Sequence, residues 1–313
     1  MKIRLGYVSV PITLSHVTAS SLMTYTYYKK LGEEEGQKRL DEIIKSNFSD
    51  LEKILYYNYK NDIYFYRLTS NLIPLSTHPE VNYEVYHRYQ TEFRRIGKLV
   101  KQYHIRIDTH PNAFCVLNSI HEEVVNSSIN ILRDQYFMFQ AMKIPGKIIL
   151  HVGSGTYGKK AGINRFIKQF RALPSALQAC ILLENDDKLY HAEDVLMICE
   201  ATGIPMVLDY HHHICNPCQT DITELLPRIY ATWEKETEPP KMHYSSPKSK
   251  KEKRSHSEYI VLDDFVEFLR VLKQQSHDVD VMLEAKAKDD AIFHLVRGLK
   301  YKNITVEGTT IFL

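Results

Sequence analysis

The stretch Lys147-Ile148-Ile149-Leu150-His151 is a short apolar run that ends in a residue able to bind a metal ion. Seven other short apolar runs are spread along the chain, and segments with helical periodicity separate them. Five of the seven lead directly into a histidine or a carboxylate, whereas the first two carry Tyr7 and Arg67 instead. The seven runs are residues 3–8, 63–66, 105–109, 180–183, 205–208, 241–242 and 281–283.

The alternation of these runs with helical patterns predicts a closed parallel barrel of eight strands, the (β/α)8 or TIM barrel of the α/β class. The runs are continuously apolar, as strands are when helices cover the outside of a parallel sheet. The barrel uses the whole chain, so we expect a single domain over residues 1–313 with its catalytic face at the strand C-terminal ends. The helical patterns cover residues 39–58, 83–102, 122–142, 161–173, 192–202, 222–234, 263–275 and 287–299.

Charge and cysteine content limit the possible partners. The net charge of +2 argues against attraction of DNA by the molecule as a whole, although basic residues gather at 94–101 and 248–254. Such strips can bind a phosphodiester backbone, and they also suit a solvated helix face and a mobile loop.

Five dispersed cysteines indicate a reduced, cytoplasmic protein, and the one close pair, Cys215 and Cys218, lacks the second pair of a zinc site. No apolar run approaches the roughly 20 residues of a membrane span.

Two local motifs allow more than one interpretation. Residues 153–158, Gly-Ser-Gly-Thr-Tyr-Gly, match a dinucleotide-binding pattern, but they follow the fourth strand rather than a leading βαβ unit. We interpret them as a loop that permits close approach to phosphate, or as a plain flexible turn. In residues 209–213, Asp-Tyr-His-His-His, an extended chain would place Asp209, His211 and His213 on one face and His212 on the other, so at least one histidine should lie behind the ligands.

Histidines and carboxylates at the strand ends should meet at one mouth of the barrel. A single histidine at a strand end is usually just a hydrogen-bonded polar residue, but their repetition around one barrel predicts a site for several metal ions. Imidazole and carboxylate ligands suit manganese, iron or zinc. Lys241 lies two residues before His243 on the same strand face, where a free ammonium would be repelled by metals. It must point away, bind phosphate, or be carbamylated into an anionic ligand.

Together these residues resemble the UV damage endonucleases, a family of excision-repair nucleases related in fold to endonuclease IV. The resemblance extends over nearly the whole chain. It rests on the motifs Gly6-Tyr7, His110-Pro111-Asn112 followed by Phe114, His151-Val152-Gly153, Leu183-Glu184-Asn185-Asp186-Asp187, Asp209-Tyr210-His211-His212, His243-Tyr244-Ser245-Ser246-Pro247-Lys248, Arg254-Ser255-His256 and Glu284-Ala285-Lys286.

The resemblance implies a metal-dependent enzyme that nicks double-stranded DNA immediately 5′ to cyclobutane dimers and (6-4) photoproducts, and also cuts at abasic sites. It further implies a cluster of three divalent ions, usually Mn²⁺, and a carboxylated Lys241. Water activated by the metals would attack the phosphorus, so no single histidine need act as the base. The implied catalytic residues are Glu184, Glu284, Lys241 and His243. The implied metal ligands are His110, His151, Glu184, Asp209, His212, His243, His256 and Glu284.

Contacts with the lesion differ from the family pattern. Ala113 stands where the family has glutamine, and the asparagine usually found after Gly-Tyr is missing around Val10-Pro11. The chain is therefore either a natural variant with altered lesion recognition or one in which glutamine has been replaced. Tyrosines of the segment 11–38 are candidates for stacking on bases, or for ordinary packing at the rim. The residues expected to contact DNA or the lesion are Tyr7, Ala113, Phe114, Lys159, Lys160, Lys248, Lys250, Lys251 and Arg254.

Three alternative functions use a similar barrel mouth. One is an abasic-site endonuclease of the endonuclease IV type, and another is a DNA-lesion binder whose activity is weakened by Ala113. The third is a sugar isomerase or epimerase, against which the basic segment 245–254 argues. In each nuclease interpretation, the partner is DNA and the protein is expected to be a monomer.

Overall fold

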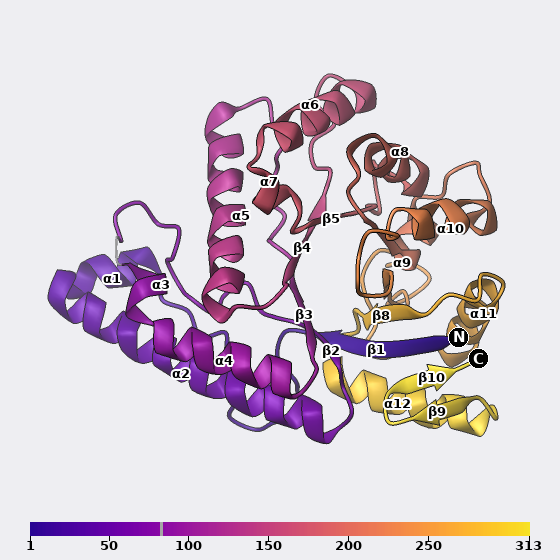
Figure 1. The fold of residues 1–313 in the computed structure, drawn as a ribbon, viewed down its shortest axis with the longest axis horizontal. Helices are drawn as coiled ribbons and strands as arrows, with labels where there is room; N and C mark the ends of the chain where they lie inside the picture. Colours follow the sequence, from indigo (N-terminus) through magenta and orange to yellow (C-terminus); the bar gives the residue numbers. More distant parts are fainter. Residues whose placement is uncertain (82–83) are drawn as a thin grey trace.

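The eight predicted strands form a closed parallel barrel in the computed structural model, which describes residues 1–81 and 84–313. Neighbouring strands in the chain pair with one another, and the first strand pairs in parallel with both the eighth and the second, which closes the barrel (Figure 1). The prediction of a (β/α)8 barrel is therefore confirmed. The strands are β1 (Lys2–Val8), β2 (Phe65–Arg67), β3 (Arg106–Thr109), β4 (Lys147–His151), β5 (Ile181–Glu184), β6 (Met206–Asp209), β7 (Lys241–Tyr244) and β8 (Val279–Leu283).

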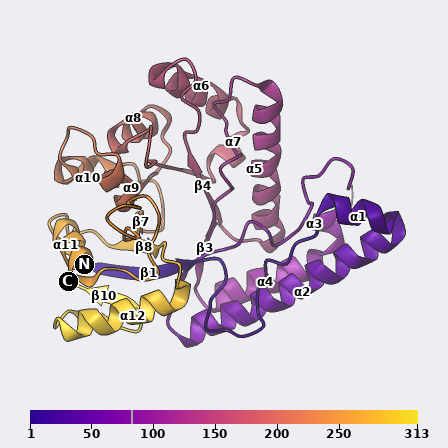
Figure 2. The same cartoon turned by 180° about the vertical axis from the view of Figure 1, so that it is seen from behind.

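Helices surround the barrel (Figures 1 and 2). They are α1 (Tyr25–Leu31), α2 (Glu33–Lys60), α3 (Val85–Arg88), α4 (Gln90–Gln102), α5 (Glu122–Met142), α6 (Lys159–Ala172), α7 (Ser175–Gln178), α8 (Ala192–Thr202), α9 (Tyr210–Cys215), α10 (Ile222–Ala231), α11 (Leu262–Lys273) and α12 (Lys288–Tyr301). The bounds of α5 and α8 agree with the prediction. Helix α2 begins well before the predicted Arg39, because three glutamates in its first turn complement the helix dipole. The predicted start of a helix at Tyr83 lies outside the described residues. Among the described helices, none is both long and apolar enough to cross a bilayer.

A hairpin at the C-terminus completes the sheet, and the sequence patterns do not predict it. Strand β2 is short and pairs with only the last two residues of β1, Tyr7 and Val8. The free edge at the start of β1 is filled by β10 (Thr310–Phe312), which pairs with β1 in the antiparallel sense. On its other side β10 pairs with β9 (Thr305–Glu307), the strand that precedes it in the chain. The two chain ends therefore lie side by side at the N-terminal end of the barrel, opposite the predicted catalytic face (Figure 1).

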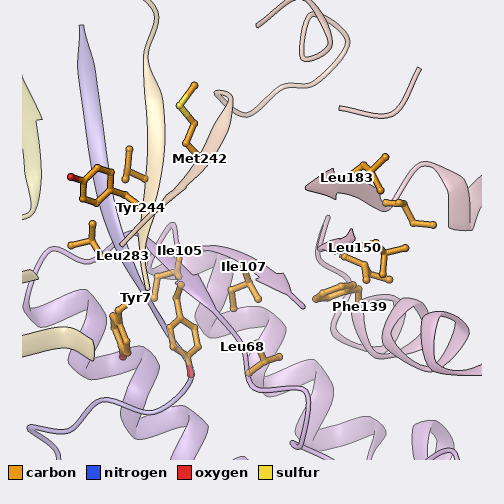
Figure 3. Packing of buried hydrophobic residues seen from close by; sticks show 14 of the residues in the cluster. Tyr7, Leu68, Ile105, Ile107, Phe139, Leu150, Leu183, Met242, Tyr244 and Leu283 are labelled. Carbon is orange, nitrogen blue, oxygen red and sulfur yellow. The ribbon is translucent and has the colours of Figure 1, made fainter. Parts of the chain in front are cut away.

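Alternation along the strands separates two apolar regions. Outward-facing side chains such as Leu150 and Leu183 join the main core between barrel and helices, where Phe139 of α5 meets them (Figure 3). Inward-facing residues form a smaller cluster, and its three strand members each precede a predicted metal ligand by two positions. Because side chains two positions apart on a strand share a face, these predicted ligands also point toward the barrel axis. The smaller cluster consists of Ile149, Leu182, Val207 and Trp233.

Candidate metal centre

The predicted ligands converge at the C-terminal mouth of the barrel. Inward-facing strand ends place most of them there, because parallel strands bring their C-terminal ends to one edge. One short helix and one loop supply the others. The eight residues are His151, Glu184 and Asp209 as the last residues of β4, β5 and β6, His110 and Glu284 just after β3 and β8, His243 within β7, His212 in α9, and His256 in the loop between β7 and α11.

Glu184 lies at the centre of this arrangement and is almost fully buried. Its Oε2 atom is 2.9 Å from His110 Nε2 and 3.6 Å from His151 Nε2. Its Oε1 atom is 2.6 Å from His243 Nδ1 and 3.8 Å from His212 Nδ1. Each carboxylate oxygen therefore faces two imidazoles, which is an arrangement suited to a ligand that joins neighbouring cations.

Glu184 is shared by two sets of ligand atoms, and within each set all atoms lie within 4.8 Å of one another. Such an overlap can place two cations on either side of one carboxylate. His256 extends the second set, because its Nδ1 is 3.9 Å from Glu284 Oε2. The first ligand group consists of His110, His151 and Glu184, and the second of Glu184, Asp209, His243 and Glu284.

Helix α9 brings His212 to the mouth, and it corrects the expectation of an extended chain in residues 209–213. Asp209 caps the helix, because its Oδ1 accepts a hydrogen bond from the His212 backbone N–H at 2.7 Å. His212 Nδ1 then lies 3.0 Å from the Asn185 carbonyl oxygen and 3.6 Å from Asp209 Oδ2. His211 faces the ring of His256 instead, so helical spacing separates these neighbouring histidines.

Burial sets the charge states of the ligands. It lowers the pKa of His110 to about 4, and it also lowers the pKa values of His151 and His243. These imidazoles are therefore neutral at pH 7, which is the form that binds metals. Burial raises the pKa of Asp209 to about 7 and raises that of Glu184, since two ionised carboxylates are costly without a cation.

The donor set fits divalent cations with nitrogen and oxygen ligands. Two buried atoms of the candidate ligands, Asp209 Oδ2 and His151 Nδ1, have no hydrogen-bond partner among the described residues. His212 adds a positive charge of the protein's own to this group. Burial lowers the pKa of this imidazole, but the charges of Asp209 and Glu184 outweigh burial and raise it to about 9. The mouth therefore contains candidate metal-binding groups, as predicted.

Arg67 and Asp108 belong to this site, although neither was among the predicted site residues. Arg67 is the last residue of β2, and its guanidinium is 2.5 Å from Glu284 Oε1 and 2.6 Å from His243 Nε2. It also lies 3.4 Å from Asp108 Oδ1. The position of Arg67 at a strand end was visible in the sequence, but Asp108 lies within an apolar run and gave no signal. The guanidinium fixes one face of the second ligand group.

Lys241 lies on the inward face of β7 and is buried. Its ammonium contacts Asp108 and stands 4.9 Å from the centre of the Phe65 ring. Burial lowers its pKa to about 7, although the charge of Asp108 opposes this shift. The other three predicted catalytic residues, Glu184, Glu284 and His243, are all members of the second ligand group.

A cavity of about 570 Å³ opens beside the first ligand group. His110, His151 and His212 line its floor, and Ala113 lines its wall. Phe114 is 81% exposed although it is a large aromatic residue, and it follows Ala113 in the loop after β3. An exposed aromatic ring beside a cavity is suited to contact a base.

Tyr7 cannot contact a lesion in this structure, which corrects the prediction. It lies on the same face of β1 as Ile3 and Leu5 and is fully buried, and its hydroxyl donates to Asn58 Oδ1 of α2 at 2.8 Å. The predicted tyrosine-rich insert also contains α1, where Tyr28 is buried. Period-two alternation explains the position of Tyr7, because a shift of one residue along a strand changes the face.

The predicted basic contacts lie on two segments. Lys248, Lys250 and Lys251 are exposed in the loop after β7, where Lys248 pairs with Glu252 at 2.8 Å. Arg254 in the same loop is 3.5 Å from Asp187 Oδ2, a residue that lines the cavity. On α6, Lys160 is exposed, whereas Lys159 is held by Asp194 at 2.7 Å. The loop after β7 is therefore the freer basic surface.

Comparisons with known proteins agree with this geometry. The model of the family described as UV-endonuclease UvdE matches residues 3–311. A UV DNA damage endonuclease of Bacillus cereus (strain B4264) is 39% identical over 309 residues, which cover 96% of this chain and 97% of the relative. The solved structure titled "Crystal Structure of SacUVDE" is 34% identical with a TM-score of 0.86, and the match covers 96% of this chain and 99% of that one.

More distant structures share the fold alone. Endonuclease IV from Thermus thermophilus has a TM-score of 0.55 at 15% identity, and the match covers 80% of this chain and 94% of that one. An L-ribulose 3-epimerase has a TM-score of 0.54, also at 15% identity, over 83% of this chain and 84% of that one. Fold similarity at this level does not separate the nucleases from the sugar epimerases, so the distinction rests on the closer relatives.

Proposed function

Because the chain belongs to the UV-endonuclease UvdE family and is thus a DNA repair endonuclease, we propose that it cuts damaged double-stranded DNA immediately 5′ to UV photoproducts with the help of divalent cations. The products would carry a 3′-hydroxyl and a 5′-phosphate. The observation that carries this proposal is the position of Glu184 between two ligand groups at the barrel mouth. We further propose a cluster of three ions, with Mn²⁺ as the preferred metal.

The residues of the mouth have distinct roles in this proposal. Bound cations would attract the phosphodiester and make water a better nucleophile at neutral pH. Glu184 holds the two ligand groups together, and Asp209 fixes the first turn of α9 so that His212 faces the cluster. Arg67 holds Glu284 and His243 in place through its two terminal nitrogens. Phe114 is exposed and follows Ala113, a residue of the cavity lining, and we propose that it enters the space left by displaced bases.

Lys241 remains a proposed carboxylated lysine. Carboxylation would replace its positive charge by a negative one and extend the side chain toward the ligands. The amine must lose its proton before it reacts with CO2, and burial favours the neutral amine. Protein equilibrated with ¹³C-labelled bicarbonate and loaded with diamagnetic Zn²⁺ should show a carbamate carbon signal that is absent from Lys241→Met, and absence of this signal from the Zn²⁺-loaded wild-type protein would contradict the modification.

A panel of defined duplexes tests the proposed function. We expect a nick at the bond 5′ to a single cyclobutane dimer or (6-4) photoproduct, and no nick in the undamaged duplex of the same sequence. An abasic duplex should also be cut, but with less preference over the undamaged duplex than a photoproduct duplex shows. It resembles the photoproduct duplex mainly in its weakened stacking. Cleavage of the abasic duplex alone would favour the endonuclease IV type of activity, and binding to photoproducts without cleavage would identify a lesion binder.

Ala113 is expected to limit lesion recognition. It is exposed on the wall of the cavity, so a longer polar side chain would reach displaced bases. Ala113→Gln should raise the rate of dimer nicking by roughly 2- to 12-fold, the equivalent of one net hydrogen bond of about 0.5–1.5 kcal/mol. The measurement is the single-turnover rate on a dimer duplex, with the exposed Ala176→Gln in α7 as the matched control. An unchanged or lower rate for Ala113→Gln alone would refute this role.

The loop after β7 is expected to bind the DNA backbone. The exposed Lys250 and Lys251 make no ion pair within the described part of the chain. Their replacement by alanine should reduce the slope of log affinity against log salt by about 0.9 for each phosphate that the loop no longer neutralises. Lys300→Ala combined with Lys302→Ala removes the same charge at the C-terminal end of α12 and should leave the slope unchanged. Equal slopes for both double variants would exclude this loop from DNA binding.

A further inference from the structure

A second cluster of metal-binding side chains lies outside the barrel mouth, where α8 begins and where the chain passes from α9 to α10. His191, Glu193 and Cys218 each offer a ligand atom here, and the three atoms lie within 4.8 Å of one another. Helices α8 and α10 pack side by side in this region (Figures 1 and 2). We propose that these three residues bind a zinc ion that is separate from the cluster at the mouth.

His191 is placed to act as a metal ligand through Nε2. It caps α8, because its Nδ1 accepts a hydrogen bond from the Asp194 backbone N–H at 3.3 Å, and the same Nδ1 lies 3.2 Å from Asp194 Oδ2. This capping bond leaves the imidazole proton on Nε2. Metal binding at Nε2 would move the proton to Nδ1, which would then donate to Asp194 Oδ2 instead of accepting from the N–H. Asp194 is itself held by Lys159 at 2.7 Å. A carboxylate behind a histidine ligand orients the imidazole and strengthens its bond to the metal.

Thr220 holds the other two ligands in position. Its hydroxyl donates to Glu193 Oε1 at 2.8 Å, and its carbonyl oxygen accepts from the Cys218 thiol at 3.3 Å. One carboxylate oxygen of Glu193 therefore remains for a cation. A metal would replace the thiol proton of Cys218, and that proton would pass to solvent. All three candidate ligands are partly exposed, so an ion can reach them.

The chemistry of this donor set favours zinc. A thiolate and an imidazole select Zn²⁺ over Mg²⁺, Ca²⁺ or Mn²⁺, which prefer oxygen ligands. The described ligands of the mouth contain only nitrogen and oxygen donors, so the two sites differ in the metal they prefer. His213 of α9 supplies a further imidazole close by, and its buried Nδ1 has no hydrogen-bond partner among the described residues. A zinc ion here would tie the start of α8 to the segment that follows α9, the helix that carries His212.

The sequence motif Cys215-Asn216-Pro217-Cys218 provides an internal control. The two cysteines do not face one site. Cys215 Sγ is 3.5 Å from the Lys253 carbonyl oxygen and 3.8 Å from His211 Nε2, whereas Cys218 belongs to the cluster with His191. Replacement of either cysteine by serine is a change of one atom at a partly exposed position, so both variants should fold.

Titration with Co²⁺ tests the site in protein whose mouth has first been loaded with Mn²⁺. A bond between sulfur and cobalt produces a strong charge-transfer absorption that nitrogen and oxygen ligands do not produce. We expect this absorption in the wild-type protein and in Cys215→Ser, its loss in Cys218→Ser, its weakening in Glu193→Gln, and its disappearance when Zn²⁺ is added. The proposal is overturned if the wild-type protein lacks the absorption, if it survives in Cys218→Ser, or if it disappears in Cys215→Ser. Circular dichroism of each variant verifies folding.

Discussion

Nicking of a dimer-containing duplex is expected to fall by at least roughly 10³-fold in EDTA and to return when Mn²⁺ is added in excess. Bound cations supply several kcal/mol of charge stabilisation at a reacting phosphate, and each 1.4 kcal/mol changes a rate about tenfold. Without cations, the mouth contains carboxylates whose pKa values are raised by burial, and His212 provides the compensating charge. The guanidinium of Arg67 is already paired with Glu284, so its charge is not free to receive a phosphodiester.

The measurement is a single-turnover nicking rate together with the metal content of the same sample. EDTA that has been saturated with Mn²⁺ before addition serves as the control, because it leaves the protein loaded while the chelator is present. Zn²⁺ and Fe²⁺ added to separate aliquots would rank the metals. Undiminished nicking by protein that retains less than one ion per chain would contradict the metal mechanism and would direct attention to Arg67 and Lys241 as the cations of the mouth.

The sequence predicts well which residues gather at the mouth, because the rule that places them is local. An apolar strand that ends in a histidine or carboxylate needs only the parallel topology to bring that residue to the common mouth. Glu184 and Asp209 follow this rule, and each lies two positions after an inward-facing apolar residue. His256 does not follow it, because it lies in a loop, and only the resemblance to a family identified it as a ligand.

The errors come from features that pattern analysis does not resolve. Tyr7, carried by the first strand, was expected to contact the lesion, yet strand alternation places it on the helix side with Asn58. Residues 209–213 were interpreted as extended, although Asp209 can cap a helix and begins one here. The hairpin of β9 and β10 is too short to give a periodic signal, and it forms because β2 leaves part of β1 unpaired.

Glu184→Gln is expected to remove most metal binding while the fold remains intact. The two oxygens of Glu184 serve both ligand groups, so its loss should weaken both at once. Removal of a residue that only orients a ligand typically costs 10- to 100-fold in affinity or activity, and loss of the shared ligand should cost at least about 100-fold. Glu236→Gln is the matched control, because Glu236 is a half-buried carboxylate paired at 2.6 Å with Lys147, the first residue of β4, at the end of the barrel opposite the mouth.

The sign of the stability change separates loss of metal from loss of fold. Burial raises the pKa of Glu184, so without metal the folded state disfavours its ionised form, and a neutral glutamine should not lower the free energy of unfolding. With metal, the wild-type protein should gain stability as ions bind, and Glu184→Gln should lose most of that gain. The melting temperatures of both proteins, with and without Mn²⁺, provide the comparison. A variant that binds the full number of ions and nicks at the wild-type rate would show that Glu184 does not join the two groups.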